Sequence, residues 1–261
     1  MSDLLQVIVL GIVEGITEFL PISSTGHLLI AEHWLGERSE LFNVAIQAGA
    51  ILAVVAIYWR RLLDLALGFG KPENRDYLFK LVGAFAITAA LGIVVKKLGW
   101  KLPEEVHPIA IALIVGGLVM IGVEAMLPKD STETNVTWTV AIAVGLAQIV
   151  AGVFPGTSRS AASIFAAMLA GTRSRAAATE FSFLVGIPTM FAATGFELLK
   201  QLKSPEGIHG ENWTDLAIGF VVSAIVAFIA VKWLLSYIQT HRFTAFAVYR
   251  IALGAALFVL I

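Results

Sequence analysis

The chain of 261 residues is 58% hydrophobic and only 14% charged, with a mean hydropathy of +0.85 and a formal net charge of −1. A soluble domain is about half apolar and about a quarter charged, so this composition indicates a helical membrane protein. The weak net charge excludes a basic surface for nucleic acid, and the absence of cysteine excludes disulfides, thiolate metal sites and a cysteine nucleophile.

The first apolar region, residues 4–34, is interrupted at Leu20-Pro21 by the polar stretch EGITEFLPISSTGH. Each half gives roughly 20–27 Å of helix at 1.5 Å per residue, which is shorter than the approximately 30 Å hydrocarbon core. Non-helical backbone at membrane depth survives only where protein or a wet cavity satisfies its polar groups. We therefore expect a re-entrant hairpin of two short helices. Because no lysine or arginine precedes Arg38, a removable signal peptide is not expected.

Uninterrupted apolar segments follow this hairpin, each with the roughly 17–25 residues that a membrane-spanning helix requires. A second broken region, residues 137–171, interrupts them and is itself broken at Phe154-Pro155-Gly156. It predicts a second re-entrant hairpin. The expected spans lie at residues 41–59, 77–95, 107–127, 177–199, 214–238 and 243–261.

The two broken regions resemble each other in sequence. The alignment pairs Gly11 with Gly145, Glu14 with Gln148, Pro21 with Pro155, Ser23 with Thr157, Ser24 with Ser158 and, further on, Phe42 with Phe181 and Ile46 with Val185. Each half holds three spans, an odd number, so the second copy would be inverted in the membrane, as in many transporters. We predict an all-α integral membrane protein, a single domain over residues 1–261, built from inverted repeats 1–130 and 131–261.

Charges in the short connections set the expected orientation. Alternation of the spans places one set of basic residues on one face: Arg60, Arg61, Lys71, Arg75, Lys129, Arg173, Arg175 and Arg242. The opposite face has the smaller set: Arg38, Lys96, Lys97, Lys101, Lys200 and Lys203. The positive-inside rule then predicts that the first face is cytoplasmic and that both termini and the first hairpin face outward.

The polar residues of the first hairpin have the character of a reactive site. Glu14 and Glu18 are four residues apart, so they share one helix face, where two carboxylates require a cation or a proton between them. The stretch Ser23-Ser24-Thr25-Gly26 then opens a new helix, whose amides and hydroxyls favour an anion. His27 lies in its first turn.

The second hairpin supplies the small polar stretch Pro155-Gly156-Thr157-Ser158-Arg159-Ser160, with Arg159 in the place that matches Thr25. Arginine's forked donors suit a phosphate. A lone hydroxyl in a membrane helix is commonly a packing group. Burying a charge costs at least about 2.5 kcal/mol, so the inference rests on the two glutamates and the arginine. If the tips meet, the combination suits phosphoryl transfer, with the acids holding a divalent cation.

Other polar residues lie outside the two tips. Gln148, Glu180 and Gln47 are expected to support the site from behind. Glu124 and Lys232 lie near helix ends and are expected to reach the interface. Arg250 lies deeper and is expected to pair with an acid.

Two long stretches, EGITEFLPISSTGHLLI and PGTSRSAASI, closely resemble the signatures of the undecaprenyl-diphosphate phosphatase family, also called bacitracin-resistance proteins. The likeness continues through FNVAIQAGAILAV, ATEFSFLVGIP and FAVYRIALGAA. It implies an enzyme of the bacterial inner membrane that converts undecaprenyl diphosphate to the monophosphate, recycling the lipid carrier of cell-wall synthesis and conferring bacitracin resistance.

The resemblance also implies dependence on a divalent cation, Mg²⁺ or Ca²⁺, an isoprenyl diphosphate lipid as substrate, and a site open to the periplasm. It leaves a homodimer open. Either Glu14 and Glu18 bind the cation, or Glu18 orients His27. The family's motifs fall on Glu14, Glu18, Ser23, Ser24, Thr25, His27, Ser158, Arg159 and Ser160. With the residues of the two tips, this gives the expected catalytic set, Glu14, Glu18, Ser24, His27 and Arg159, and the expected phosphate-binding set, Ser23, Thr25, Gly26, Gly156, Thr157, Ser158 and Ser160. Two positions depart from the family pattern: Ala161 stands where a glycine is expected and Ser163 where a threonine is expected.

The residues leave three mechanisms open. Ser24 attacks with His27 as base, His27 attacks directly, or His27 activates a water. They also leave a rival of another class, a lipid-carrier flippase or transporter that uses the same residues only to bind, since inverted repeats with broken helices fit transport equally well.

Overall fold

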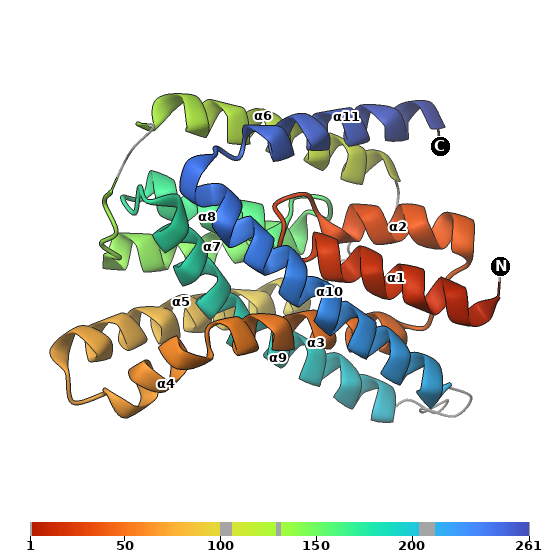
Figure 1. The fold of residues 1–261 in the computed structure, drawn as a ribbon, viewed down its shortest axis with the longest axis horizontal. Coiled ribbons are helices and arrows are strands. Elements are labelled where there is room, and N and C mark those ends of the chain that lie inside the picture. Colours follow the sequence, from red (N-terminus) through yellow and green to blue (C-terminus); the bar gives the residue numbers. More distant parts are fainter. Residues whose placement is uncertain (1, 100–105, 129–131, 204–211, 261) are drawn as a thin grey trace.

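The computed structural model describes residues 2–99, 106–128, 132–203 and 212–260, all helix or connecting segment, with no strand in these ranges. Lys101 and Lys129, two of the basic residues used above for orientation, lie outside the described residues. The helices are α1 (Asp3–Thr17), α2 (Ser24–Leu35), α3 (Glu40–Ile57), α4 (Trp59–Leu67), α5 (Pro72–Lys97), α6 (Val106–Met126), α7 (Trp138–Val153), α8 (Arg159–Leu169), α9 (Arg175–Lys203), α10 (Trp213–Thr240) and α11 (Thr244–Leu260) (Figure 1).

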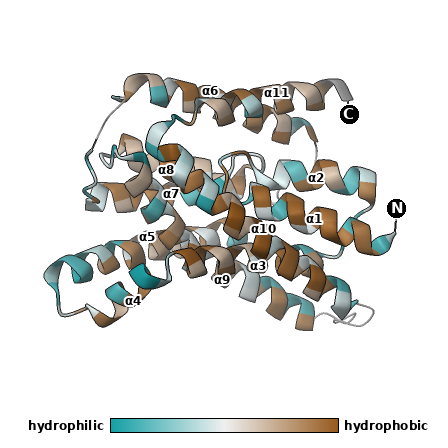
Figure 2. Cartoon of the chain, in the orientation of Figure 1, coloured by the Kyte–Doolittle hydropathy of each residue, from teal (hydrophilic) through white to brown (hydrophobic). Residues whose placement is uncertain are grey.

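Among the described residues, 5 helices have the length and composition of a membrane span: α3, α5, α6, α9 and α10. They correspond to five of the six expected spans. The sixth, residues 243–261, is α11, which has 17 residues and reaches about 25 Å at 1.5 Å per residue. Large apolar side chains remain exposed along these helices, for example Ile111 and Val115 on α6 and Ile229 on α10, and Figure 2 shows the apolar residues spread along them. An apolar exterior of this kind faces lipid, so the protein is a multi-pass membrane protein.

The helices pack closely because small residues lie at their contacts. α10 packs against both α3 and α1, α5 against α7, and α6 against α11 (Figure 1). A Cβ added at Gly49 of α3 would lie 2.3 Å from the Phe220 carbonyl oxygen of α10, and one added at Gly15 of α1 would lie 2.7 Å from the Ser223 carbonyl oxygen. In a bilayer, where apolar contact with lipid competes with apolar contact between helices, such close approach supplies much of the packing energy.

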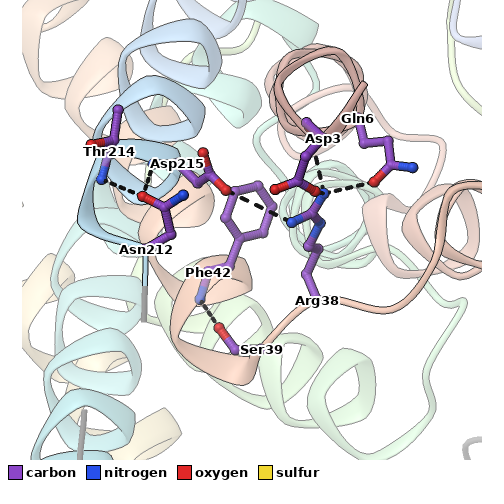
Figure 3. Close-up of polar contacts among 8 residues, drawn as sticks. All are labelled: Asp3, Gln6, Arg38, Ser39, Phe42, Asn212, Thr214 and Asp215. Atoms are coloured by element: carbon purple, nitrogen blue, oxygen red, sulfur yellow. Dashed lines mark hydrogen bonds and ion pairs between the residues drawn. The ribbon is translucent and has the colours of Figure 1, made fainter. Parts of the chain in front are cut away.

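Arg38 connects the N-terminal ends of three helices, α1, α3 and α10 (Figure 3). Arg38 pairs with Asp3 and donates to Gln6 Oε1 at 2.8 Å, both on α1, and its Nη1 lies 3.9 Å from Asp215 Oδ2 on α10. The guanidinium also lies 5.9 Å from the centre of the Phe42 ring on α3. This cluster fixes the N-terminal end of α1, at the opposite end of the helix from the polar tip.

At the other side of the molecule, α4 and the start of α5 form a polar turn (Figure 2). The Asn74 amide donates to Asp64 Oδ2 at 3.2 Å, and Lys71 Nζ donates to Asp64 Oδ1 at 3.4 Å. The Asn74 hydrogen bond, with Lys71 second, holds the pKa of the Asp64 carboxyl below its ordinary value.

Glu124 corrects one sequence expectation. It lies near the end of α6 but is only 1% exposed, so it does not reach the interface. Arg175 of α9 donates to both carboxylate oxygens, at 3.0 and 2.5 Å, and the Phe243 amide donates to Oε1 at 3.0 Å. A buried carboxylate requires such partners, and these hold α6, α9 and the start of α11 together. Lys232, in contrast, is exposed as expected, with its Nζ 4.8 Å from the centre of the Phe228 ring.

Candidate active site

The two polar tips share an uncommon backbone conformation. Ser23 and Ser158 precede α2 and α8 with φ values of 75° and 68°, and they are the non-glycine residues with positive φ in the described chain. Their hydroxyls accept from the amides of Gly26 at 3.4 Å and Ala161 at 3.3 Å, so each caps its helix. The structure therefore matches Ser23 with Ser158, where the sequence alignment paired it with Thr157.

This one-residue correction has a simple cause, because the second tip has an additional residue between its proline and its capping serine. It also changes which residues occupy equivalent places. Ser24 opens α2 as Arg159 opens α8, so the arginine corresponds to Ser24 and not to Thr25.

Glu18 is the point at which the two tips meet. Its Oε2 accepts from the Ser24 hydroxyl at 2.5 Å, and its Oε1 pairs with Arg159 Nη2. The Glu18 side chain is 3% exposed and that of Arg159 is 26% exposed, so the pair lies at the edge of the buried interior. Glu18 thus contacts a hydroxyl from its own half of the chain and a guanidinium from the other half, so the condition that the tips meet is fulfilled.

Further hydroxyls join the tips through the backbone. Ser160 Oγ donates to the Leu20 carbonyl at 3.0 Å and lies 3.0 Å from Ser158 Oγ. Ser163, one of the two departures from the family pattern, donates to the Arg159 carbonyl at 2.6 Å. Ser160 thus holds the second tip against the first, while the Ser163 bond stays within α8.

The contacts of His27 indicate the tautomer of its neutral ring. Its Nδ1 lies 2.7 Å from the Ser23 carbonyl oxygen, which only accepts, so Nδ1 carries the hydrogen. In the neutral ring Nε2 then accepts from the Tyr249 hydroxyl at 2.7 Å, and the two rings stack at 5.6 Å between centroids. Both ring nitrogens are therefore occupied, and neither of these bonds is to Ser24.

Buried polar atoms without partners mark places where a bound ion or water fits. Glu14 is 2% exposed and its Oε2 has no hydrogen-bond partner among the described residues. Both amide atoms of Gln148 on α7 are likewise unpartnered within the described chain. Unpaired buried oxygens of this type are ligands that Mg²⁺ and Ca²⁺ prefer. The described residues contain no group of three or more acidic, histidine or cysteine side chains placed to hold a metal ion together.

Some of the remaining predicted residues lie in the tips, and the others, Glu180 and Gln47, lie on α9 and α3. Gly26 and Gly156 are buried in the tips, Thr25 is exposed and Thr157 is half-buried. Glu180 is not joined to the tips by its hydrogen bond: it accepts from Arg61 Nε of α4 at 3.2 Å. Gln47 lies half-buried on α3.

Arg250 is wholly buried and pairs with no acid among the residues that the structure describes, which corrects another expectation. It donates instead to backbone carbonyls, among them Pro21 at 3.4 Å and Gly156 at 3.0 Å, one in each tip. Its neighbour Tyr249, which contacts His27, was not singled out from the sequence. One feature of the sequence could have identified Tyr249: it directly precedes an intramembrane arginine in the stretch FAVYRIALGAA.

An apolar cavity of about 690 Å³ lies beside the second tip, between α6, α7 and α8. Its lining includes Ile111 and Val119 of α6, Phe165 of α8, and Pro155 and Thr157 of the second tip. The cavity is therefore lined in part by residues that closely precede Arg159 in the chain.

These features define a class: a multi-pass helical membrane protein in which two interrupted segments join an acid, a hydroxyl and a guanidinium beside an apolar cavity. Residues 7–256 match the family described as bacitracin resistance protein BacA, and the chain belongs to this family.

Curated relatives agree over nearly the whole length. The protein named undecaprenyl-diphosphatase from Rhizobium etli (strain CIAT 652) is 67% identical over 255 residues, covering 98% of this chain and 96% of the relative. That from Stenotrophomonas maltophilia (strain R551-3) is 63% identical over 257 residues, covering 98% and 97%. The resemblance found in the sequence is confirmed, as is the expectation of an enzyme, since the relatives carry an enzyme's name.

Proposed function

We propose that this protein hydrolyses undecaprenyl diphosphate to undecaprenyl phosphate and inorganic phosphate, and so recycles the lipid carrier of cell-wall synthesis and confers bacitracin resistance. The observation that carries the proposal is the contact of Glu18 with both Ser24 and Arg159. This contact places a nucleophile, its base and a phosphate-binding guanidinium together, and relatives over 60% identical bear the name of this activity.

The geometry favours Ser24 as the nucleophile with Glu18 as its base. Ser24 Oγ attacks the terminal phosphorus while its proton passes to Glu18 Oε2, 2.5 Å away. The bond from phosphorus to the bridging oxygen breaks, this oxygen takes the proton from Glu18, and undecaprenyl phosphate leaves with Glu18 again ionised. Water then attacks the phosphoserine, giving one proton to Glu18, which returns a proton to Ser24 Oγ as inorganic phosphate departs. His27, bound to Ser23 and Tyr249, orients the tip in this scheme and is not the attacking atom.

Arg159 has two partners in this mechanism. Without substrate its guanidinium pairs with Glu18. A diphosphate competes for the same forked donors. Moving Arg159 onto the phosphate leaves Glu18 free to accept the Ser24 proton, so binding of the substrate itself prepares the base.

A divalent cation, Mg²⁺ or Ca²⁺, fits beside these residues. Glu14 Oε2, buried and without a partner in the described chain, would bind it together with Glu18. When bound, the cation would neutralise negative charge on the diphosphate.

The apolar cavity is the proposed place of the isoprenyl chain. Its volume of about 690 Å³ falls within the roughly 300–1,000 Å³ of typical ligand sites. Because Pro155 and Thr157 belong to its lining, a tail lying there would bring its diphosphate toward Arg159, two residues after Thr157.

We also propose an inverted repeat of residues 1–130 and 131–261, each with a re-entrant hairpin, in the bacterial inner membrane with the site open to the periplasm. The equal conformations of Ser23 and Ser158 support it. So do two matching helix contacts: Gly11 of α1 approaches the Gly219 carbonyl of α10, and Gly145 of α7 approaches that of Ala84 on α5.

The test is phosphate release from a polyprenyl diphosphate by the purified protein in detergent, with and without EDTA. We expect release that depends on a divalent cation and is lost in Glu18→Gln and Ser24→Ala. Trapping of a phosphoenzyme should place the label on Ser24. Label on His27 would overturn the assignment of the nucleophile. Absence of release from folded protein, across several cations and lipids, would favour a flippase or transporter that uses the site only to bind.

A further inference from the structure

Arg250, in the middle of α11, is the largest of the fully buried side chains and is 0% exposed. Its guanidinium donates to four backbone carbonyls: Nη2 to Gly156 at 3.0 Å and to Ala112 at 3.2 Å, Nη1 to Pro21 at 3.4 Å and Nε to Leu113 at 3.4 Å. Within the described chain no carboxylate forms an ion pair with it. This differs from Arg175, also buried, whose charge is matched by Glu124.

The four carbonyls belong to three segments that have to meet for the site to exist. Pro21 is in the first tip, Gly156 is in the second, and the other two lie on α6. A break in a helix leaves carbonyls without their helical partners, and inside a membrane protein each needs a donor. Only arginine among the side chains offers five donors in a rigid planar fork. The single guanidinium of Arg250 therefore satisfies one carbonyl at each break and links both tips to α6.

We propose that Arg250 is a positioning residue of the active site, which holds the two tips at the spacing that brings Arg159 onto Glu18 and lends an unpaired positive charge to the binding of the diphosphate. The proposal rests on the proposed phosphatase activity for its second part. The first part, the clamp on the tips, stands on geometry alone.

Close packing of α11 on α6 is what allows the guanidinium to reach the tips. A Cβ added at Gly116 of α6 would lie 2.3 Å from Arg250 Nη2, and a Cβ added at Gly117 would lie 2.7 Å from the Ala247 carbonyl oxygen. A methyl group at residue 116 would therefore displace the guanidinium itself. Gly122, on the same helix, faces open space, with no atom within 4 Å of an added Cβ. The two glycines make a matched pair for substitution.

The variants to compare are Arg250→Lys, Arg250→Met, Gly116→Ala and the control Gly122→Ala. Lysine keeps the charge but cannot reach four carbonyls, so we expect kcat to fall about 100-fold, the cost of misplacing reacting groups by about 1 Å, with little change in KM. Methionine removes the charge as well, so KM for the lipid diphosphate should also rise. Gly116→Ala should resemble Arg250→Lys in direction, and Gly122→Ala should retain wild-type kinetics.

Amide hydrogen exchange followed by mass spectrometry tests the clamp without relying on activity. In Arg250→Lys and Gly116→Ala, exchange should accelerate in segments 18–26 and 154–161 while the contact between α3 and α10 keeps its protection. Unchanged exchange at both tips together with unchanged kcat in Arg250→Lys would overturn the proposal. If Arg250→Met does not fold, Gly116→Ala supplies the answer. If the wild-type protein releases no phosphate, the proposed function fails, and the exchange experiment still decides whether Arg250 clamps the tips.

Discussion

Replacing Arg159 by alanine removes the guanidinium through which the second tip contacts Glu18. Two effects follow from the geometry. A charge-assisted hydrogen bond contributes about 1.5–3 kcal/mol, and loss of a donor that stabilises developing negative charge lowers kcat by about 10²- to 10³-fold. We therefore expect kcat/KM of Arg159→Ala to fall at least about 100-fold. Arg159→Lys keeps the charge without the fork, so we expect an intermediate loss of about tenfold.

The assay is phosphate release at several concentrations of a polyprenyl diphosphate, normalised to folded protein by size-exclusion chromatography. Arg38→Ala is the matched control. Like Arg159, Arg38 is a partly buried arginine that pairs with a carboxylate, but its partner Asp3 lies at the N-terminal end of α1, away from the tips (Figure 3). Its turnover should remain close to that of the wild type. Near-normal turnover in folded Arg159→Ala would refute the role of this arginine as the phosphate clamp.

The remaining predictions concern contacts away from Arg159. Tyr249→Phe removes the hydroxyl on His27 Nε2 but keeps the stacked ring, so kcat should fall and the pH–rate profile should shift with little change in melting temperature; an identical profile would contradict this. Glu124→Gln leaves Arg175 buried without its counter-charge, so urea unfolding should show a loss of about 3–5 kcal/mol with turnover per folded molecule unchanged. The hydrogen bonds from Asn74 and Lys71 lower the pKa of Asp64. They therefore stabilise the α4–α5 turn at pH values above the ordinary pKa of an aspartate, and this stabilisation is lost as the pH falls through the lowered pKa. Hydrogen exchange in residues 64–75 should accelerate there, and Asp64→Asn should remove this pH dependence.

The membrane class and most spans follow from the sequence because long apolar segments have one common solution in a bilayer. The cost of burying Glu18 and Arg159 marked both as functional residues, whereas the meeting of the two tips was only a condition of the hypothesis, and the structure shows it in the contact between these two residues. The exact alignment of the two tips was harder to predict. The sequence paired Ser23 with Thr157, one residue before the true match, because Thr157 and Ser158 are both able to cap a helix and only the backbone conformation distinguishes them.

The partners of single charges were the least predictable feature. Glu124 was expected at the interface and Arg250 beside an acid. Position along a helix predicts depth, but it does not indicate that α9 brings Arg175 to Glu124 or that two broken helices offer carbonyls to Arg250. Such partners are far away in sequence. They become visible only when the helices are placed in space, and the same holds for the contact between Tyr249 and His27.

The positive φ angles of Ser23 and Ser158 have a consequence for engineering this protein. Glycine adopts such angles freely, whereas a residue with a side chain incurs a conformational cost of order 1–3 kcal/mol at each position. A search for thermostable variants would therefore be drawn toward glycine at both corners. Those same changes would delete the hydroxyls that cap α2 and α8 beside the reacting groups. Selection for heat resistance alone would tend to yield a sturdier and less active protein, and the two corners are where we expect stability and turnover to be opposed.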